Sequence, residues 1–221
     1  MRLHYETMKR SAWCINFDPA CDGFQYEPLV DIRDLISLDD VTDPDEDLRL
    51  GPNGGLVYCM EYLQQNLDWL DDALSASTAE DDVIFVDCPG QIELYTHMDV
   101  FTPILEKFRS HNFNVCSIFM LDAQFLTECG KFMGGVLTAL SAMVKLEVPH
   151  VNIMSKMDLL SVQAREKLED FMDPVSYKFH ERGKDGNEKR TRLTDKLYQI
   201  IEDFSMVQFF PLEKRSKNVR T

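Results

Sequence analysis

Two short polar motifs in this chain have the residue types and spacing that nucleotide chemistry requires. The first, Asp87-Cys88-Pro89-Gly90-Gln91, directly follows four consecutive apolar residues. A carboxylate in that position can hold a magnesium ion on a nucleotide phosphate, and the glycine amide can meet the terminal phosphate. Gln91 stands where a side-chain amide can orient an attacking water. The alternative is that Asp87 only caps the turn at the end of a core strand.

The second motif is Ser155-Lys156-Met157-Asp158, which has the [NTS]KxD form of guanine recognition. Guanine presents two adjacent N–H donors that one carboxylate can accept, and adenine does not. Asp158 would accept both hydrogen bonds, while the aliphatic stem of Lys156 would cover the face of the base. A KxD sequence is common by chance. It carries more weight here because it follows an apolar run and lies downstream of the first motif, and Asp158 disfavours an ATP site.

These motifs need strands to position them, and the chain alternates short apolar runs with helical patterns. We predict strands at 12–17, 83–86, 115–121, 150–154 and 207–211. Such alternation is typical of an α/β fold with a mainly parallel sheet and helices on both faces, in which the strands at 83–86 and 115–121 are buried. The predicted strand ends carry ionisable groups at Asp18, Asp87, Asp122 and 156–158. Ligands of such sheets bind at this edge, although Asp18, which precedes a proline, could equally cap a turn.

The longest helical pattern follows a Gly-Pro-Asn sequence at 51–53. Its apolar residues recur at spacings of 4, 3, 4, 3 and 4: Leu56, Met60, Leu63, Leu67, Leu70 and Leu74. This spacing predicts one long helix whose apolar face packs on the core or, alternatively, binds another helix. On chemistry alone, GPNGG is a turn that starts a helix, with Asn53 near the N-cap.

Residues 92–110 are predicted to be helical in part, and further helices are predicted at 123–147, 162–172 and 193–204. The helix at 123–147 has one expected apolar face, made by Phe132, Val136, Leu140, Met143 and Val144. Gly134-Gly135 in its middle lowers helix stability but permits close packing against a neighbour.

Composition excludes several classes of protein. The net charge is −15, from 23 Lys+Arg and 38 Asp+Glu, so we expect no direct nucleic-acid binding through a broad basic face. The six cysteines form no CxxC pair and the five histidines are scattered, which indicates reduced thiols in a cytosolic or nuclear protein and no zinc site. No apolar run approaches the length of a membrane span, so no membrane partner is expected. The 221 residues show no internal boundary, and we predict a single domain over 1–221.

Five segments together strongly resemble the GPN-loop GTPases, most closely the GPN-loop GTPase 3 branch: NFDPA, DIRDLI, GPNGGLVYCMEY, DCPGQIELYTH and VNIMSKMDLL. The resemblance spans residues 12–211. It implies a P-loop NTPase-like fold, GTP binding and hydrolysis with Mg²⁺ as cofactor, and a homodimer or a heterodimer with a GPN-loop paralogue. It also implies a role in RNA polymerase II biogenesis and nuclear import, with polymerase II subunits as partners and a cytoplasmic protein that shuttles to the nucleus.

The resemblance also implies a phosphate-side set of residues. Gly51, Pro52 and Asn53 match the loop that reaches into the partner's nucleotide site, where Asn53 would stabilise the released phosphate in trans. Asp87 would bind magnesium through water. Asp18 lies in the family's switch region, where it would orient water or metal.

For the other residues the resemblance implies contacts with the nucleotide itself. Gly90 would contact the terminal phosphate, and Gln91 would complete the catalytic set with Asn53 and Asp18. Ser155, Lys156 and Asp158 would hold guanine. Ser205 and Met206 fall where the family's last base-contacting loop lies.

The chain departs from the family pattern in one large respect. The family begins with a strand and a P-loop, GxxxxGK[ST], which supplies backbone N–H groups, a lysine and a hydroxyl to the phosphates and magnesium. This pattern does not occur in the 221 residues: neither Gly130-Lys131 nor Gly183-Lys184 has a glycine five residues earlier or a Ser or Thr next. From the resemblance we expect that Met1 falls within the family's first helix, and that the family's first strand, its P-loop and the helix after its last strand are not among these residues.

Two hypotheses follow from this departure. One is an incomplete or alternatively started version of a GTPase. The other is a nucleotide-free interaction module that dimerises with a GPN-loop paralogue. Because a phosphate cradle makes several charge-assisted contacts of about 1.5–3 kcal/mol each, we expect these residues alone to bind GTP weakly or not at all. We also expect lower stability, because apolar neighbours of a lost strand would be uncovered.

Overall fold

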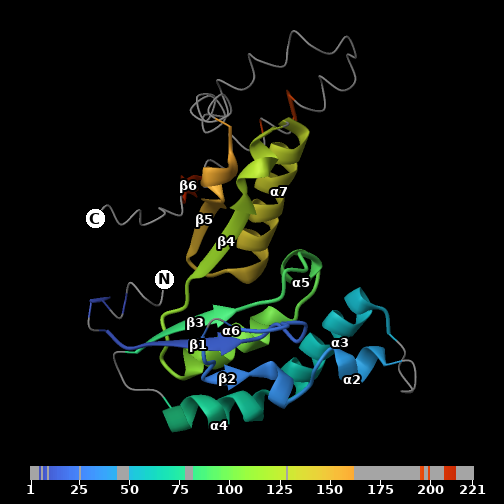
Figure 1. Cartoon of the computed structure of the whole chain (residues 1–221), viewed down its shortest axis with the longest axis vertical. Helices are drawn as coiled ribbons and strands as arrows, with labels where there is room; N and C mark the ends of the chain where they lie inside the picture. Colours follow the sequence, from blue (N-terminus) through green and yellow to red (C-terminus); the bar gives the residue numbers. More distant parts are fainter. Residues whose placement is uncertain are drawn as a thin grey trace, which may run out of the picture. The chain divides into compact units, whose positions relative to one another are not determined.

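The computed structural model describes residues 5, 7–8, 10–24, 26–43, 50–77, 82–127, 129–161, 195–196, 199 and 207–212. The chain divides into two compact units, Met1–Asn114 and Val115–Thr221, called here the N-terminal unit and the C-terminal unit (Figure 1). Each unit contains a parallel sheet with helices, so the predicted α/β class is confirmed. The single-domain organisation stays a prediction.

The sheet of the N-terminal unit brings the ends of three strands together. Its strands are β1 (Ala12–Asn16), β2 (Val30–Asp31) and β3 (Val83–Asp87), in the order β2-β1-β3. All pairs are parallel, and Asn16 at the end of β1 stands opposite both Asp31 and Asp87. The predicted strands at 12–17 and 83–86 are therefore confirmed, and their carboxyl ends lie at one edge of the sheet.

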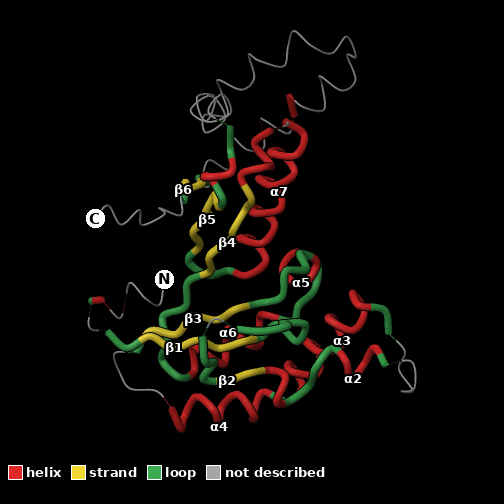
Figure 2. The backbone as a smooth tube through the Cα atoms, in the orientation of Figure 1, coloured by secondary structure: helices red, strands yellow, loops and turns green. Residues whose placement is uncertain are grey.

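The helices of the N-terminal unit pack around this sheet (Figure 2). They are α2 (Asp39–Thr42), α3 (Pro52–Gln65), α4 (Leu67–Ser77), α5 (Glu93–Thr96) and α6 (Phe101–Ser110), with a 3₁₀ turn at Ile32–Asp34. Phe17, which follows β1, is 1% exposed and its ring lies 6.3 Å from that of Phe108 in α6. Gly55 lets α3 approach α2 closely, since a Cβ there would lie 2.7 Å from Leu38.

The predicted single helix after residue 51 is wrong, because the structure has two helices separated at Asn66. The backbone of Asn66 leaves helical geometry, with φ −119° and ψ 40°. Its side-chain Nδ2 donates to the Tyr62 carbonyl at 2.8 Å, which is how asparagine competes with the helix ladder. The apolar residues of both helices still face the core: Met60, Leu63, Leu70 and Leu74 are each 0% exposed.

The C-terminal unit contains β4 (Ser117–Asp122), β5 (His150–Ser155) and β6 (Phe209–Pro211), in the order β4-β5-β6. The predicted strands in these positions are confirmed. Two 3₁₀ helices, Ala123–Thr127 and Met157–Leu159, follow β4 and β5. The helix α7 (Cys129–Leu146) packs on the sheet, and a Cβ at Gly135 would lie 2.7 Å from Leu121. Gly135 therefore permits the close packing that the sequence predicted, whereas a Cβ at Gly134 would meet nothing within 4 Å.

The predicted apolar face of α7 is wrong in part. Val144 is 63% exposed, while Met133, Val136, Ala139 and Ala142 are buried. The buried positions recur every three residues, so the core-facing stripe ends on small alanines that the hydrophobic pattern undervalued. Predicted helices at 162–172 and over most of 193–204 lie outside the described residues.

The prediction that β3 and β4 are buried strands is also wrong. Val86 in β3 is 37% exposed, and Ile118 and Met120 in β4 are 42% and 55% exposed. Over the described ranges, each of these strands lies at the outer edge of its sheet, with a neighbouring strand on one side. An edge strand leaves side chains and backbone groups uncovered on its outer side.

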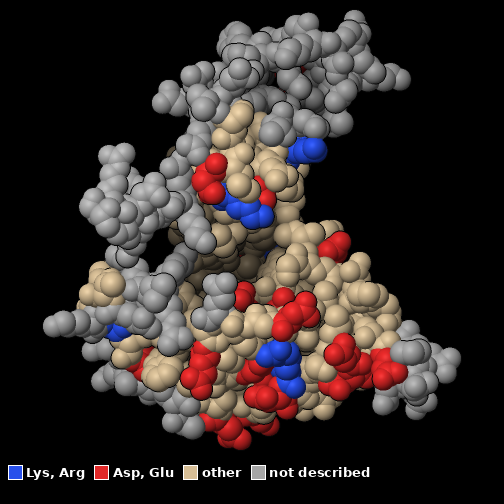
Figure 3. Space-filling view, viewed as in Figure 1, with Lys and Arg blue, Asp and Glu red and all other residues tan. Residues whose placement is uncertain are grey.

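Two further observations concern the surface charge of the N-terminal unit and the length of the described helices. Acidic side chains spread over the visible face of the N-terminal unit (Figure 3). No helix among the described residues is long and apolar enough to cross a membrane.

Candidate functional site

The ends of β1 and β3 place two carboxylates beside one loop. Phe17 N donates to the Asp87 carbonyl at 2.7 Å, so the pairing of the strands continues to the last residue of β3. Asp18 follows in a turn, with its Oδ1 accepting from Ala20 N at 3.0 Å. The turn-capping alternative for Asp18 is thus present in the structure, and it leaves Oδ2 for another partner.

The pKa of Cys88 is affected by the two carboxylates. Burial, followed by the negative charges of Asp87 and Asp18, raises the pKa of the Cys88 thiol to about 12. A thiol with such a pKa is protonated at neutral pH and is a poor nucleophile. A neutral thiol leaves the oxygens of Asp18 and Asp87 as the groups beside this loop that suit a cation on a phosphate.

The loop Cys88–Gln91 is held by one aromatic side chain. The Tyr95 hydroxyl donates to the Pro89 carbonyl, and the Tyr95 ring stacks on Phe101 with centroids 4.8 Å apart. Gly90 is exposed, has no positive φ, and a Cβ there would meet nothing within 4 Å. Nothing in the folded chain requires glycine at this position, so the absence of a side chain fits the close approach of a ligand.

Gln91 has an unusual environment for an amide. Its Oε1 is buried and has no hydrogen-bond partner in the part of the chain that the structure describes. Buried acceptors are normally paired, and an unpaired one calls for an explanation such as a catalytic role or a bound water. This observation is compatible with the predicted water-orienting role of Gln91.

The Gly-Pro-Asn sequence forms the exposed start of α3. Gly51 is the N-cap, with φ −69° and ψ 163°, and Pro52 is the first helical residue. Asn53 is therefore the second helical residue, and no side chain caps the first turn. The amide of Asn53 is exposed and available to a ligand outside the unit.

The Ser155-Lys156-Met157-Asp158 motif follows β5 and is tied to the end of β4. Ser155 stands opposite Asp122, and its Oγ donates to the Leu121 carbonyl at 3.2 Å. Lys156 adopts a left-handed backbone, with φ 58° and ψ 33°, and its Nζ lies 2.8 Å from Asp122 Oδ2. A left-handed lysine is strained, and such strain is concentrated at functional sites.

The surroundings of this motif affect the pKa of Asp122 and the exposure of Met157 and Asp158. The backbone N–H of Gln124, followed by the ammonium of Lys156, lowers the pKa of Asp122. Met157 is 2% exposed and anchors the turn, whereas Asp158 is exposed. The carboxylate predicted to accept two bonds from guanine therefore faces solvent from an anchored turn.

The structure brings the predicted residues together in two groups. Asp18, Asp87, Gly90 and Gln91 share the strand ends of the N-terminal unit, and Ser155, Lys156 and Asp158 share those of the C-terminal unit. Ser205 and Met206 lie outside the described residues.

Three further residues contact the motifs. Asp122 binds Lys156, Tyr95 binds Pro89, and Tyr26 donates to Asp87. Asp122 was predicted as an ionisable strand end at the ligand edge but without a specific contact, and sequence reasoning assigned no role to either tyrosine. The two tyrosines carry no sequence pattern that could have revealed them.

The donor set at Asp87 and Asp18 fits a magnesium ion that is held mainly by phosphate. Mg²⁺ is usually bound by one or two carboxylates together with phosphate oxygens and water. Within the described ranges, no group of three or more His, Cys, Asp or Glu side chains could hold a metal ion without such a ligand. A magnesium ion would accordingly arrive with, or depend on, a nucleotide.

Comparisons with known proteins agree on the family. Residues 1–221 match a family model described as "Conserved hypothetical ATP binding protein". GPN-loop GTPase 3 from Danio rerio is 46% identical over 216 residues, which are 97% of this chain and 75% of that protein. The Xenopus tropicalis protein of the same name is 48% identical with the same coverage, and the Saccharomyces cerevisiae one is 44% identical over 96% of this chain and 78% of its own length.

The structural comparison supports the fold. The crystal structure of a GTPase from Pyrococcus abyssi in its apo form matches with a TM-score of 0.73 at 19% sequence identity. The match covers 95% of this chain and 81% of that one. The strand ends and their motifs thus stand in a P-loop GTPase fold. Within this class the chain belongs to the GPN-loop GTPase family, as its resemblance to GPN-loop GTPase 3 predicted.

Proposed function

We propose that this protein binds GTP with Mg²⁺ and hydrolyses it. The observation that carries the proposal is the pair of motifs at the carboxyl ends of parallel strands, where α/β proteins bind ligands. Asp158 faces solvent from the turn anchored by Met157, so its carboxylate is free to accept the N–H donors of guanine. Adenine lacks these donors, and the proposed substrate is therefore GTP rather than ATP.

The residues of the N-terminal unit would act on the phosphates. Asp87 would hold magnesium through water, and Asp18 would orient water or the metal. The Gly90 amide would donate to the terminal phosphate, and the Gln91 amide would orient the attacking water. A bound Mg²⁺ supplies charge neutralisation at the phosphates.

We also propose that the protein forms a homodimer or a heterodimer with a GPN-loop paralogue. Asn53, exposed at the start of α3, would then stabilise the released phosphate in the partner's site. A role in RNA polymerase II biogenesis and nuclear import, binding to polymerase II subunits, and shuttling between cytoplasm and nucleus are proposed from the family resemblance alone.

The test is thermal melting of the full chain with Mg²⁺ and GTP, ATP or xanthosine triphosphate. Because the 221 residues contain no GxxxxGK[ST] pattern, binding is expected to be weak, and GTP should raise the melting temperature only at high concentration. ATP should not raise it at any concentration. Asp158→Asn should lose the GTP effect by about 10–100-fold in affinity, because each hydrogen bond to a charged group contributes about 1.5–3 kcal/mol. The variant should gain affinity for the xanthine base, whose carbonyl pairs with an amide donor.

The matched control is Asp72→Asn, an exposed aspartate of α4. It should leave all three nucleotide responses unchanged. A cooperative melt that GTP does not shift would contradict the GTPase proposal, and the nucleotide-free interaction module would then be the better account.

A further inference from the structure

The side chain of Tyr26 meets the carboxylate of Asp87, 61 residues away in the sequence, with the hydroxyl donating to Oδ2 at 3.0 Å. Among the described residues no hydrogen bond to Asp87 Oδ1 is found. The contact therefore fixes one carboxylate oxygen of an exposed residue and leaves the other for a ligand.

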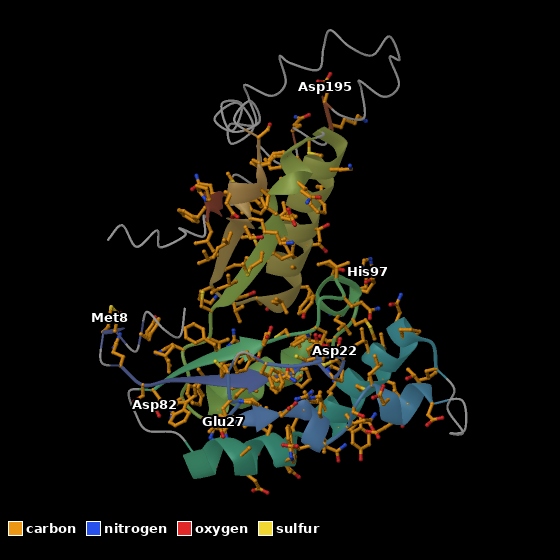
Figure 4. All side chains as sticks on the ribbon, viewed as in Figure 1. Met8, Asp22, Glu27, Asp82, His97 and Asp195 are labelled. Atoms are coloured by element: carbon orange, nitrogen blue, oxygen red, sulfur yellow. The ribbon has the colours of Figure 1, made fainter. Side chains whose placement is uncertain are left out.

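The loop that carries Tyr26 connects β1 to β2, and its Asp22 lies beyond the ends of β1 and β3 in Figure 4. Aromatic packing holds the loop in place. The Tyr26 ring lies 5.0 Å from that of Phe24, and the Arg33 guanidinium lies 4.5 Å over the Phe24 ring. Arg33 Nη1 also donates to the Cys21 carbonyl at 2.8 Å. Arg33 thus holds the loop at Cys21 and at Phe24, whose ring lies next to that of Tyr26.

Arg33 is itself anchored to the sheet. It forms an ion pair of 2.7 Å with Asp31, the last residue of β2. Asp31 Oδ1 accepts from Asn16 Nδ2 at 2.9 Å, and Asn16 is 0% exposed at the end of β1. Asn16 also stands opposite Asp87 in the sheet. A continuous series of contacts therefore connects β1, the strand paired with β3, to the Tyr26 hydroxyl that donates to Asp87.

We propose that Tyr26 is a positioning residue that orients the Asp87 carboxylate for the metal of the nucleotide site. The inference rests on the proposed function, in which Asp87 holds magnesium. Mg²⁺ demands near-ideal octahedral geometry, so a carboxylate that rotates freely is a poor ligand for it or for its waters. Ligating carboxylates are in turn hydrogen-bonded, and loss of such a partner typically weakens metal affinity by about 10–100-fold.

The experiment is a titration of the full chain with Mn²⁺, a paramagnetic substitute for Mg²⁺, in the presence of GTP, followed by electron paramagnetic resonance, with the same titration of GTP alone as the baseline. The wild type should bind Mn²⁺ and Asp87→Asn should not. Tyr26→Phe should bind about 10–100-fold more weakly than the wild type. Tyr62→Phe, the same change at a tyrosine of α3 that is 36% exposed, should match the wild type.

A second readout separates positioning from a merely structural role. With GTP present, addition of Mg²⁺ should change the near-ultraviolet tyrosine absorbance of the wild type and of Tyr62→Phe. This change should be missing in Tyr26→Phe, whose melting temperature should equal that of the wild type. Equal or tighter Mn²⁺ binding by Tyr26→Phe, with binding lost in Asp87→Asn, would overturn the inference and leave the metal role of Asp87 standing. Binding that survives in Asp87→Asn, or no binding by the wild type, would overturn both.

Discussion

The two neighbouring glycines of α7 allow one packing contact to be measured alone. Gly134→Ala and Gly135→Ala are the same chemical change at adjacent positions of one helix. A Cβ at residue 134 meets nothing within 4 Å, whereas a Cβ at residue 135 meets Leu121 Cδ2 at 2.7 Å and Cδ1 at 3.0 Å. We expect the first variant to be stabilised and the second to be destabilised relative to it.

The expected difference follows from these contacts. Replacing glycine by alanine inside a helix contributes about 0.5–1 kcal/mol of stability, and this gain is common to both variants. Overpacking a core costs about 1–3 kcal/mol. The atoms met are the methyl ends of the Leu121 side chain, which can move, but Leu121 is 6% exposed and lies in a buried apolar cluster, so its movement must displace neighbouring side chains. Gly135→Ala should therefore be about 1–3 kcal/mol less stable than Gly134→Ala.

Urea unfolding of the two variants in parallel measures this difference, and their melting temperatures should differ by about 2–4 °C per kcal/mol for a chain of this size. Gly135→Ala should also weaken any stabilisation by GTP, because Ser155 Oγ donates to the Leu121 carbonyl. If Gly135→Ala were as stable as Gly134→Ala, the packing of α7 against β4 would not be as described.

Three other predictions concern the N-terminal unit. Gly90→Ala should leave the unfolding free energy within about 0.5 kcal/mol of the wild type and abolish stabilisation by GTP; a fall in melting temperature without nucleotide would contradict the open space around Gly90. Tyr95→Phe should lose about 1 kcal/mol in urea unfolding, because the bond to the Pro89 carbonyl is removed; an unchanged midpoint would refute its role in holding the loop. Burial raises the pKa of Asp31, but hydrogen bonds from Arg33 and neighbouring groups outweigh it and lower the pKa overall. This carboxylate therefore adds stability above its unfolded pKa of about 3.9, and that stability is lost as the pH falls through the lower folded pKa. Asp31→Asn should flatten the pH dependence of unfolding between those two values, and an unaltered acid limb would count against the ion pair.

Much of the fold could be predicted from the sequence because strand ends are marked by a change from apolar to charged residues. The positions of Asp87 and of Ser155–Asp158 at strand ends followed from that change. The break at Asn66 did not, because the apolar spacing continues through it and only the local competition of an asparagine side chain interrupts the helix. The exposure of Val144 was missed because the buried face of α7 ends in two alanines, Ala139 and Ala142, which a hydrophobicity pattern barely registers.

The candidate site was predicted only where its residues form motifs. Lys156 was placed correctly after its strand, but its left-handed backbone and its ion pair with Asp122 were not predicted, because Asp122 is close in the sheet and distant in the sequence. Tyr26 shows the same limit. Its contact with Asp87 exists because Arg33 and Phe24 hold the loop, and no spacing in the sequence encodes that arrangement.

The uncovered side of β3 has a consequence for how another segment could align with it. Val83 N donates to Ser11 O at 3.2 Å, so the backbone groups of Val83, and by alternation those of Phe85 and Asp87, turn toward β1. The alternation turns the groups of Ile84 and Val86 outward. An extended segment laid along this side could bond in steps of two residues only, since a shift by one places side chains on the wrong face. Each permitted register would therefore place the residues of the added segment at a defined distance along the strand from the Asp87 carboxylate.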